Sequence, residues 1–296
     1  MKPAIFQAIF CVVKTSEYTH HHSTKERATR FKRLSRTKQE QIELSQKNQI
    51  DFLAKLKKYA SEIGLKIQFI TEQSMDSVSP GIDDLVISCG GDGTFLSCAQ
   101  MYLSSTLLGM NSDYQLKAGS GSFGALTSTN HINLKQNLIS LKDQQFAIHK
   151  WNRLQASING KLIEQYAVND IYFGQKIAYQ TCDLRITQSG ESEEFNCSGV
   201  LCCTGMGSHA WYYNAGGNPF SNELDAFGFQ VLFPNLKWPL RFTSGIVASR
   251  YDLVIIPERD HYVLSYDSKP DVIETFLGDE IRLFLAPDNA VRVVSF

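Results

Sequence analysis

Short apolar runs alternate with helical patterns in the first third of the chain. Apolar runs at residues 4–13, 65–70, 84–89 and 107–110 predict strands, and helical spacing of apolar residues at 50–63 and 94–103 predicts helices between them. Strands that alternate with helices predict a parallel sheet with crossover connections. The continuous apolar character of residues 84–89 indicates a strand that is covered on both faces.

From residue 154 onward the pattern changes to short runs that alternate in polarity. These runs lie at residues 154–158, 166–173, 184–188, 200–203, 253–256, 263–266, 280–285 and 290–294. Turn signals such as Asn159-Gly160 separate several of them. We therefore predict an α/β N-terminal domain with a parallel sheet over residues 1–128. An antiparallel β-rich, sandwich-like C-terminal domain is predicted over residues 129–296.

Composition and charge narrow the classes of function. Of the 296 residues, 43% are hydrophobic and 20% charged, and the formal net charge is −1. A net charge this close to zero produces no positive electrostatic field that would attract nucleic acid. No apolar run is long enough to cross a bilayer. The seven cysteines contain no Cys-x-x-Cys pair, so we expect buried reduced thiols rather than a zinc site. We expect a cytoplasmic enzyme with no nucleic-acid or membrane partner.

The strongest chemical signal is the run Gly90-Gly91-Asp92-Gly93-Thr94 between a predicted buried strand and a predicted helix. Glycines let the backbone approach a ligand closely, and N–H groups at the start of a helix favour a phosphate. A carboxylate there would repel phosphate unless it has a chemical task. Asp92 is therefore a candidate general base, or a ligand of a divalent metal that bridges phosphates. The alternative is a tight turn capped by an aspartate.

A second glycine loop follows the apolar run 200–203. Its candidate ligand-lining residues are Thr204, Gly207, Ser208, Ala210 and Trp211. Small residues permit close backbone approach, and the indole could stack on a ring. A turn in a β-domain with a tryptophan in the core is the alternative interpretation.

The pair Asn169-Asp170 follows the run Tyr166-Ala167-Val168. An amide beside a carboxylate can bind ribose hydroxyls and base edges. A strand with two exposed polar residues would give the same pattern, so the pair by itself is a weak signal.

Gly119, Gly121 and Gly124 match the G-x-G-x-x-G spacing of dinucleotide-binding folds. No clear apolar strand leads directly into them, and asparagines follow instead of a strongly apolar helix. We therefore interpret them as part of a glycine-rich active-site segment. The sequence contains no G-x-x-x-x-G-K-[ST] motif, which excludes a P-loop kinase.

Residues 25–38 hold seven basic residues against one acidic residue. Arg27, Arg30, Arg33 and Arg36 recur at i, i+3 spacing, which predicts one stripe along a single helix. The stripe is either a solvated face or a cationic surface that attracts nucleotide phosphates.

Taken in order, these motifs resemble the NAD kinase family over most of the chain. The matching segments are GGDGT at 90–94, Leu-Gly-Met-Asn at 108–111, the glycine-rich segment 121–127, Asn169-Asp170, the loop 204–211 and Ala-Gly-Gly at 215–217. The amino-acid sequences of these motifs most resemble those of the mitochondrial-type branch of the family. The chain departs from the family at Asp170, where glutamate is usual. It departs again at Ala125, where many members have a phenylalanine that packs on the nucleotide. In this chain a phenylalanine, Phe123, lies two positions earlier.

The resemblance implies transfer of the γ-phosphoryl group of ATP to the adenosine 2′-hydroxyl of NAD, with Mg²⁺ or another divalent metal as cofactor. It implies that Asp92 is the general base and that Gly90, Gly91, Gly93 and Thr94 hold the donor phosphates. Asn169, Asp170, Thr204, Gly207, Ser208, Ala210, Trp211 and Phe123 would line the NAD site. A homodimer or homotetramer is also implied. Two alternatives stay open, namely a lipid kinase that shares the GGDGT loop and a catalytically weak dinucleotide-binding protein.

Overall fold

The computed structural model describes residues 6–114, 123–177, 180–236 and 239–296. The chain divides into two compact units. The first unit comprises the chain up to Lys150 together with the C-terminal segment Val291–Phe296. The second unit is Trp151–Ala290. This division lies later than the predicted boundary after residue 128. Helix α5 (Leu134–Lys142) accounts for the difference, because its apolar face belongs to the core of the first unit.

The first unit contains a six-stranded sheet in the order β2-β1-β3-β4-β18-β5. Its strands are β1 (Ile9–Val13), β2 (Gln68–Thr71), β3 (Leu85–Gly90), β4 (Thr106–Asn111), β5 (Ala147–Trp151) and β18 (Val291–Ser295). The pairs β1–β2, β1–β3, β3–β4 and β4–β18 are parallel, as predicted. Because the strands are parallel, β1, β3 and β4 all end at one edge of the sheet, where Gly90 lies opposite Asn111.

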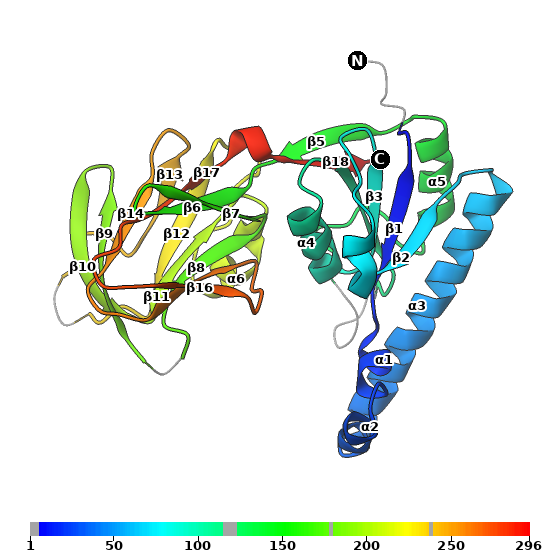
Figure 1. Cartoon of the computed structure of the whole chain (residues 1–296), viewed down its shortest axis with the longest axis horizontal. Coiled ribbons are helices and arrows are strands. Elements are labelled where there is room, and N and C mark those ends of the chain that lie inside the picture. The colour runs from blue at the N-terminus through cyan, green and yellow to red at the C-terminus, as the bar shows by residue number, and fades with distance from the viewer. Residues whose placement is uncertain (1–5, 115–122, 178–179, 237–238) are drawn as a thin grey trace. The chain divides into compact units, whose positions relative to one another are not determined.

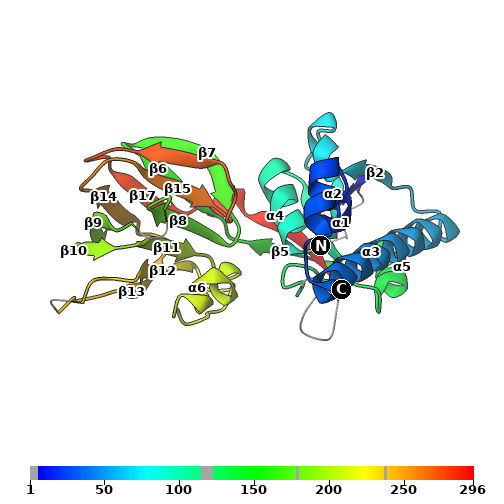
Figure 2. The ribbon, with the colours of Figure 1, turned by 90° about the horizontal axis from the view of Figure 1, so that it is seen from below.

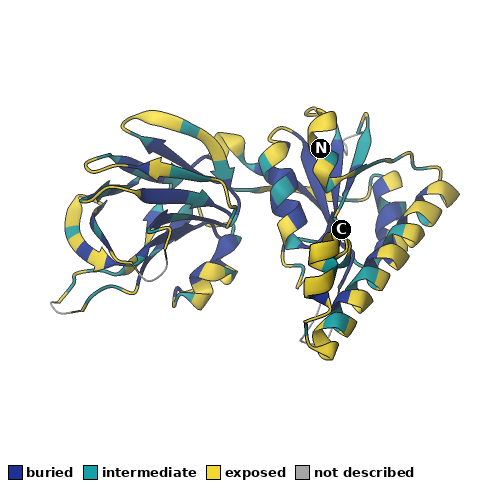
Figure 3. Cartoon of the chain, turned by 60° about the horizontal axis from the view of Figure 1, so that its bottom comes forward, coloured by how far each residue is buried: buried dark blue, intermediate teal, exposed yellow. Residues whose placement is uncertain are grey.

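Helices cover both faces of this sheet (Figure 1). Helices α3 (Arg36–Glu62) and α5 pack on one face, where Phe52, Leu56 and Leu138 join a core with the strands. Helix α4 (Asp92–Met101) lies on the opposite face. Figure 3 shows the contrast between the buried strands and the exposed outer face of α3. Burial on both faces explains why β3 and β4 are apolar along their whole length.

The N-terminal helical region corrects the prediction of an arginine stripe. Helix α1 (Glu17–His21) and helix α2 (Lys25–Phe31) come first, and α3 begins only at Arg36. Ser35 caps α3 by accepting a hydrogen bond from the Lys38 N–H, and this cap separates the two longer helices. Arg27 and Arg30 lie on α2, while Arg33 lies in the turn. The four arginines therefore do not share one helix, and the predicted stripe is wrong.

The second unit consists of two antiparallel sheets. One has the order β10-β9-β14-β17-β6-β7 and the other β13-β12-β11-β8-β15-β16. Their strands are β6 (Leu154–Ile158), β7 (Lys161–Ala167), β8 (Asp170–Gly174), β9 (Cys182–Gln188), β10 (Glu191–Cys197), β11 (Gly199–Cys203), β12 (Ala226–Leu232), β13 (Ser244–Ala248), β14 (Leu253–Pro257), β15 (Tyr262–Tyr266), β16 (Val272–Thr275) and β17 (Ile281–Leu285).

One apolar core fills the space between these two sheets. It combines residues of both, such as Leu184 and Leu283 from one and Phe173 and Phe229 from the other. Figure 2 shows the sheets one above the other, with the short helix α6 (Trp211–Asn214) on the outer side of β11 and β12. The arrangement confirms the predicted antiparallel, sandwich-like architecture.

Two predicted runs have a different place in the fold. Residues 166–173 form the end of β7 and most of β8, because the chain turns at Val168 and Asn169. The run 290–294 does not belong to the antiparallel sheets. It becomes β18, which pairs in parallel with β4 of the first unit. Its alternation of polarity carries no information about the sheet that it joins.

Candidate active site

The glycine loop lies at the C-terminal edge of the parallel sheet. Strand β3 ends at Gly90, Gly91 caps α4, and the helix begins at Asp92, two residues earlier than predicted. The N–H groups of Thr94 and Phe95 both donate to the Gly91 carbonyl. A Cβ at Gly90 would lie 2.3 Å from Thr94 Oγ1, so the close packing of Thr94 on the strand end requires glycine there.

Gly93 differs from Gly90 because nothing in the described structure requires it. A Cβ at Gly93 would meet no atom within 4 Å, and the residue lies in the first turn of α4 without a positive φ. Glycine in a helix costs up to about 1 kcal/mol relative to alanine. Its presence leaves an open surface beside the first N–H groups of the helix, where an anion is favoured.

The Asp92 carboxylate joins the loop to the glycine-rich segment that follows β4. Oδ1 accepts the Leu126 N–H at 2.8 Å, and Oδ2 accepts the N–H groups of Gly124 and Ala125, both at 3.2 Å. Gly124 has a φ of 75°, and a Cβ there would lie 2.5 Å from the Asn111 side chain. The ends of β3 and β4 and the segment 124–126 thus meet at one half-buried carboxylate.

The other members of the predicted glycine-rich segment are only partly visible. Gly119 and Gly121 lie outside the described residues. Phe123 is described and is 89% exposed, so most of its side chain is left uncovered by the described residues. Its predicted contact with a nucleotide stays a prediction.

A polar cavity of about 140 Å³ opens beside the glycine loop. Its lining residues are Lys14, Glu17, Ser45, Gln49, Gly90, Gly91, Ser112 and Asp113. The Asp113 carboxylate accepts from Ser45 Oγ at 2.5 Å and from Asn48 Nδ2 at 2.9 Å, which ties it to α3. Lys14 also lines an adjoining cavity of about 350 Å³.

Sequence reasoning missed these walls of the cavity. Lys14 follows directly after β1, and its N–H donates to the Cys89 carbonyl beside Gly90. Its ammonium makes no ion pair within the described ranges. The position of Lys14 just after the first apolar strand was an available signal, because parallel strands end together at the edge where ligands bind.

In the second unit, Asn169 and Asp170 lie where the chain turns from β7 into β8. Asp170 is the first residue of β8 and is 3% exposed. Burial raises the pKa of its carboxyl from 3.8 to about 7, and the charge of Asp267 adds to the effect. Asn169 Oδ1 and Asp170 Oδ1 are buried and have no hydrogen-bond partner in the described structure. They are thus available to a ligand that could satisfy them.

The loop that follows β11 packs against the same turn. The Thr204 N–H donates to the Asn169 carbonyl at 3.0 Å, and Thr204 Oγ1 donates to the Val168 carbonyl at 2.5 Å. A Cβ at Gly207 would lie 2.0 Å from the Asn169 carbonyl oxygen, so only glycine fits there. The structure therefore brings together the two polar motifs that the sequence places more than thirty residues apart.

The side chains of this loop divide into inner and outer residues. Thr204 and Ser208 are fully buried, and Ser208 Oγ is bonded to the carbonyls of Gly205 and Phe220 and to the Phe220 N–H. These hydroxyls fold the loop. Trp211 is 40% exposed and stacks on Tyr172, with ring centroids 5.6 Å apart. Ala210 comes directly before it as the N-cap of α6.

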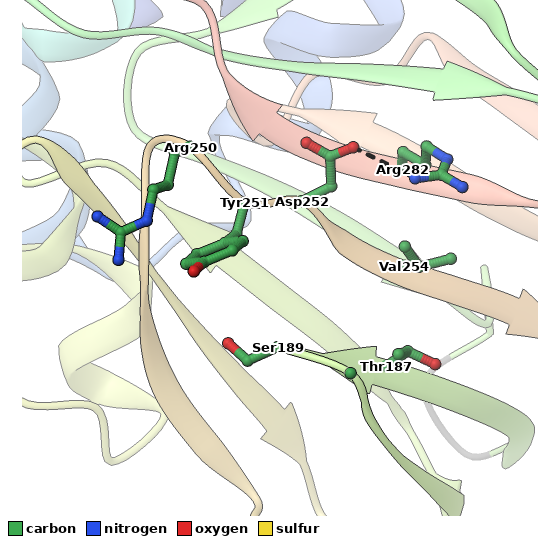
Figure 4. A pocket seen from close by; sticks show the side chains of 8 residues that line it. Thr187, Ser189, Arg250, Tyr251, Asp252, Val254 and Arg282 are labelled. Atoms are coloured by element: carbon green, nitrogen blue, oxygen red, sulfur yellow. Dashed lines mark hydrogen bonds and ion pairs between the residues drawn. The ribbon is translucent and has the colours of Figure 1, made fainter.

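A separate cavity of about 310 Å³ lies in the second unit between the turn after β9 and the segment before β14 (Figure 4). Thr187, Ser189, Gly190, Arg250, Tyr251, Asp252, Val254 and Arg282 line it. The Arg282 guanidinium is engaged by Glu280 at 2.7 Å and by Asp252 at 3.5 Å. No residue predicted for the site lies here.

Two further findings concern metals and membranes. Among the residues that the structure describes, no group of three or more His, Cys, Asp or Glu side chains is arranged to hold a metal ion. The helices in this part of the chain are too short or too polar to span a membrane.

Comparison with known sequences places the chain near one group of enzymes. No family model matches it. A probable NADH kinase from Oryza sativa is 32% identical over 169 residues, which cover 51% of this chain and 52% of that protein. An NAD kinase from Desulforamulus reducens is 28% identical over 194 residues, 63% of this chain and 64% of the relative. An NAD kinase from Pseudomonas entomophila is 26% identical over 233 residues, which cover 71% of this chain and 73% of that protein. The chain thus matches between about half and three quarters of these relatives' lengths.

Solved structures confirm the fold. An NAD kinase from Archaeoglobus fulgidus, solved in complex with ATP, superimposes with a TM-score of 0.65 at 16% identity and covers 97% of this chain and 93% of that chain. The yeast NADH kinase complexed with NADH gives a TM-score of 0.68 at 17% identity and covers 100% of this chain and 84% of that chain. Sequence and fold therefore confirm the resemblance to the NAD kinase family. The likeness to the mitochondrial-type branch stays a prediction.

Proposed function

We propose that this chain, whose sequence and fold resemble those of NAD kinases, transfers the γ-phosphoryl group of ATP to the adenosine 2′-hydroxyl of NAD. One observation carries the proposal. The GGDGT loop ends a buried parallel strand and opens α4, and its aspartate is held by three N–H groups of the segment 124–126. An anion-binding backbone beside one oriented carboxylate suits phosphoryl transfer, which depends on positioning and on electrostatic stabilisation.

In the proposed reaction, Asp92 accepts the proton of the attacking hydroxyl. The 2′-oxygen forms a bond to the γ-phosphorus, and the bond from that phosphorus to the β–γ bridging oxygen breaks. ADP leaves with the electron pair of that bond. The hydrogen bonds from Gly124, Ala125 and Leu126 fix the plane of the carboxylate, so its orientation does not depend on the substrate. Gly90, Gly91, Gly93 and Thr94 supply the backbone that faces the donor phosphates.

The divalent metal belongs to the same proposal. Mg²⁺ is commonly held by one or two carboxylates together with substrate phosphates, so it does not need a cage of protein ligands. Asp92 is the carboxylate of the glycine loop that would reach such an ion, which would neutralise charge on the phosphates.

The acceptor side is assigned to the second unit. We propose that Asn169 and Asp170 bind a ribose or base of NAD, because each has a buried oxygen without a partner in the described residues. Trp211 and Ala210 are proposed to border the same site, with Gly207 allowing the backbones to approach. Thr204 and Ser208 act from beneath by holding the loop. Phe123, a residue of the first unit that is 89% exposed, is proposed to pack on a nucleotide ring.

The test is a coupled assay with purified protein, Mg-ATP and NAD, in which an NADP-dependent dehydrogenase reports the product. Parallel reactions with NADH and with diacylglycerol, followed by the release of ADP, separate the acceptor classes. NADH is included because the relatives comprise both NAD and NADH kinases. We expect turnover of a dinucleotide and none of the lipid. Binding of NAD without turnover would favour a non-catalytic dinucleotide-binding protein. Cytoplasmic location and a homodimeric or homotetrameric assembly remain part of the proposal, and sedimentation of the purified protein tests the second.

A further inference from the structure

A single carboxylate from a distant segment holds the turn that carries Asn169 and Asp170. Asp267 follows β15, and its Oδ1 accepts the N–H groups of Asn169 at 2.7 Å and Asp170 at 3.2 Å. Its Oδ2 accepts the Val168 N–H at 3.0 Å. The Asp267 N–H donates in return to the Asp170 carbonyl at 2.9 Å. Asp267 is 5% exposed, so these bonds lie away from solvent.

The backbone at Asp267 is itself in an uncommon conformation. Asp267 and Ser268 have φ values of 48° and 56°, in the left-handed region that non-glycine residues seldom adopt. Such a conformation persists only where the surroundings fix it, and it is frequent near functional sites. Here the conformation brings the carboxylate onto the turn from Val168 to Asp170.

The same turn is fixed from its other side by the loop after β11. The Asn169 carbonyl accepts the Thr204 N–H, and Gly207 packs directly on that carbonyl. The backbone of the turn is thus held on two sides, while Asn169 Oδ1 and Asp170 Oδ1 make no hydrogen bond within the described part of the chain. A rigid backbone with unsatisfied side-chain oxygens is the arrangement of a preformed binding site.

The electrostatic surroundings of Asp170 give Asp267 a second effect. Groups that act on Asp170 or lie near it are Asp267, the thiols of Cys202 and Cys203 on β11, and the buried guanidinium of Arg153, which interacts with Asp267. Burial raises the pKa of both thiols, so they stay neutral. The negative charge of Asp267 therefore opposes ionisation of Asp170 and adds to the effect of its burial.

We propose that Asp267 is a positioning residue for the acceptor site, which orients Asn169 and Asp170 and whose charge sets the pH at which the site binds a dinucleotide. The proposal rests on the proposed function, because it assigns the acceptor to this turn. A hydroxyl of the ligand donates to the ionised Asp170 carboxylate, and charge-assisted hydrogen bonds are stronger than neutral ones. Affinity for the dinucleotide therefore rises with pH as Asp170 ionises.

The experiment measures NAD binding by calorimetry between pH 5.5 and 8.5 for the wild type and for Asp267→Asn, Asp267→Glu and Asp170→Asn. The wild type should show a midpoint near the pKa of Asp170. Asp267→Asn keeps one oxygen as an acceptor and removes the charge. Its midpoint should move to lower pH, and its affinity at high pH should fall about tenfold through the lost bond to Val168. Asp267→Glu should bind more weakly than the wild type but keep the wild-type midpoint. Asp170→Asn should lose the pH dependence.

A second readout separates this inference from the proposed function. Carbon-13 NMR of the Asp170 carboxyl, recorded on ligand-free protein, gives its pKa in the wild type and in Asp267→Asn. A lower pKa in the variant supports the charge effect even if NAD does not bind, in which case the proposed function fails. An unchanged pKa, or an equal loss of NAD affinity at every pH in Asp267→Asn and Asp267→Glu, would reduce Asp267 to a purely structural role and overturn the inference.

Discussion

The Leu126 N–H donates to Asp92 Oδ1 at 2.8 Å, across 34 positions of sequence. This bond, with those from Gly124 and Ala125, makes the glycine loop and the segment after β4 one structural unit. The carboxylate proposed as the general base is therefore also the group that shapes its own surroundings. A substitution at Asp92 must be judged against its structural effect as well as its chemical one.

We expect Asp92→Asn to lower kcat by about 10²–10⁴-fold, because an amide cannot accept the proton of the attacking hydroxyl. Steady-state kinetics and NAD binding are the measurements, and NAD should still bind. Asp84→Asn is the matched control. Its carboxylate also accepts backbone N–H groups, from Ala8 and Gly81, but it lies at the opposite end of β3. The control should lose stability and keep its kcat.

Titration with Mg²⁺ distinguishes two roles of Asp92. High Mg²⁺ should partly restore a variant that has lost a metal ligand, and it should not restore one that has lost a base. Near-normal turnover in Asp92→Asn would contradict both roles and leave only the shaping of the loop.

Gly93→Ala is expected to stabilise the protein and to weaken ATP binding. The added methyl group meets no atom within 4 Å, and alanine is the better helix former by up to about 1 kcal/mol. The methyl group would, however, occupy the space that we assign to the donor phosphates. Thermal unfolding and the KM for ATP test the two effects. Gly90→Ala should instead destabilise the fold, because its Cβ would overlap Thr94. An unchanged KM in Gly93→Ala would place the phosphates elsewhere.

Lys14→Met should raise the KM for ATP by about tenfold. The ammonium lies on the wall of the cavity beside Gly90 and Gly91, where a cation would attract a phosphate. Lys47→Met, at an exposed position of α3, is the control and should leave KM unchanged. Equal values for the two variants would show that Lys14 has no role in binding the donor.

The stability of the second unit should depend on pH through Asp170. Its pKa in the folded state, about 7, lies above the ordinary value of 3.8. Between these two pH values the unfolded chain releases a proton that the folded chain retains. The free energy of unfolding should therefore fall as pH rises from about 4 to about 7 and then level off, by an amount on the order of 4 kcal/mol.

Urea unfolding at pH 5 and at pH 7.5 measures this dependence. The free energy of unfolding of Asp170→Asn, relative to that of the wild type, should be greater at pH 7.5 than at pH 5. The variant does not bear the cost of burying an ionised carboxylate. Asp288→Asn, at an exposed position, should follow the wild type at both pH values. A difference between Asp170→Asn and the wild type that does not change with pH would contradict the raised pKa.

Several features of the fold follow from local pattern. The apolar runs at β3 and β4 and the glycine loop between β3 and α4 were predictable, because burial on both faces and a sharp turn leave clear signatures in short windows. The arginine stripe failed for a local reason as well. Ser35 is a strong N-cap, and the i, i+3 spacing hid the helix boundary that it creates.

The sequence by itself determined the two architectures, and it singled out Asp92 as the candidate general base that the proposed function uses. Tertiary structure decided which distant segments meet. It brought Leu126 to Asp92, Asp267 to Asn169, and Lys14 to the glycine loop. It also returned β18 to the first sheet. Periodicity records which side of an element is buried, whereas it does not record the partner that buries it. Hydrogen bonds between remote backbone and side-chain groups depend on where the packed cores place the ends of the strands, which a short window of sequence does not record.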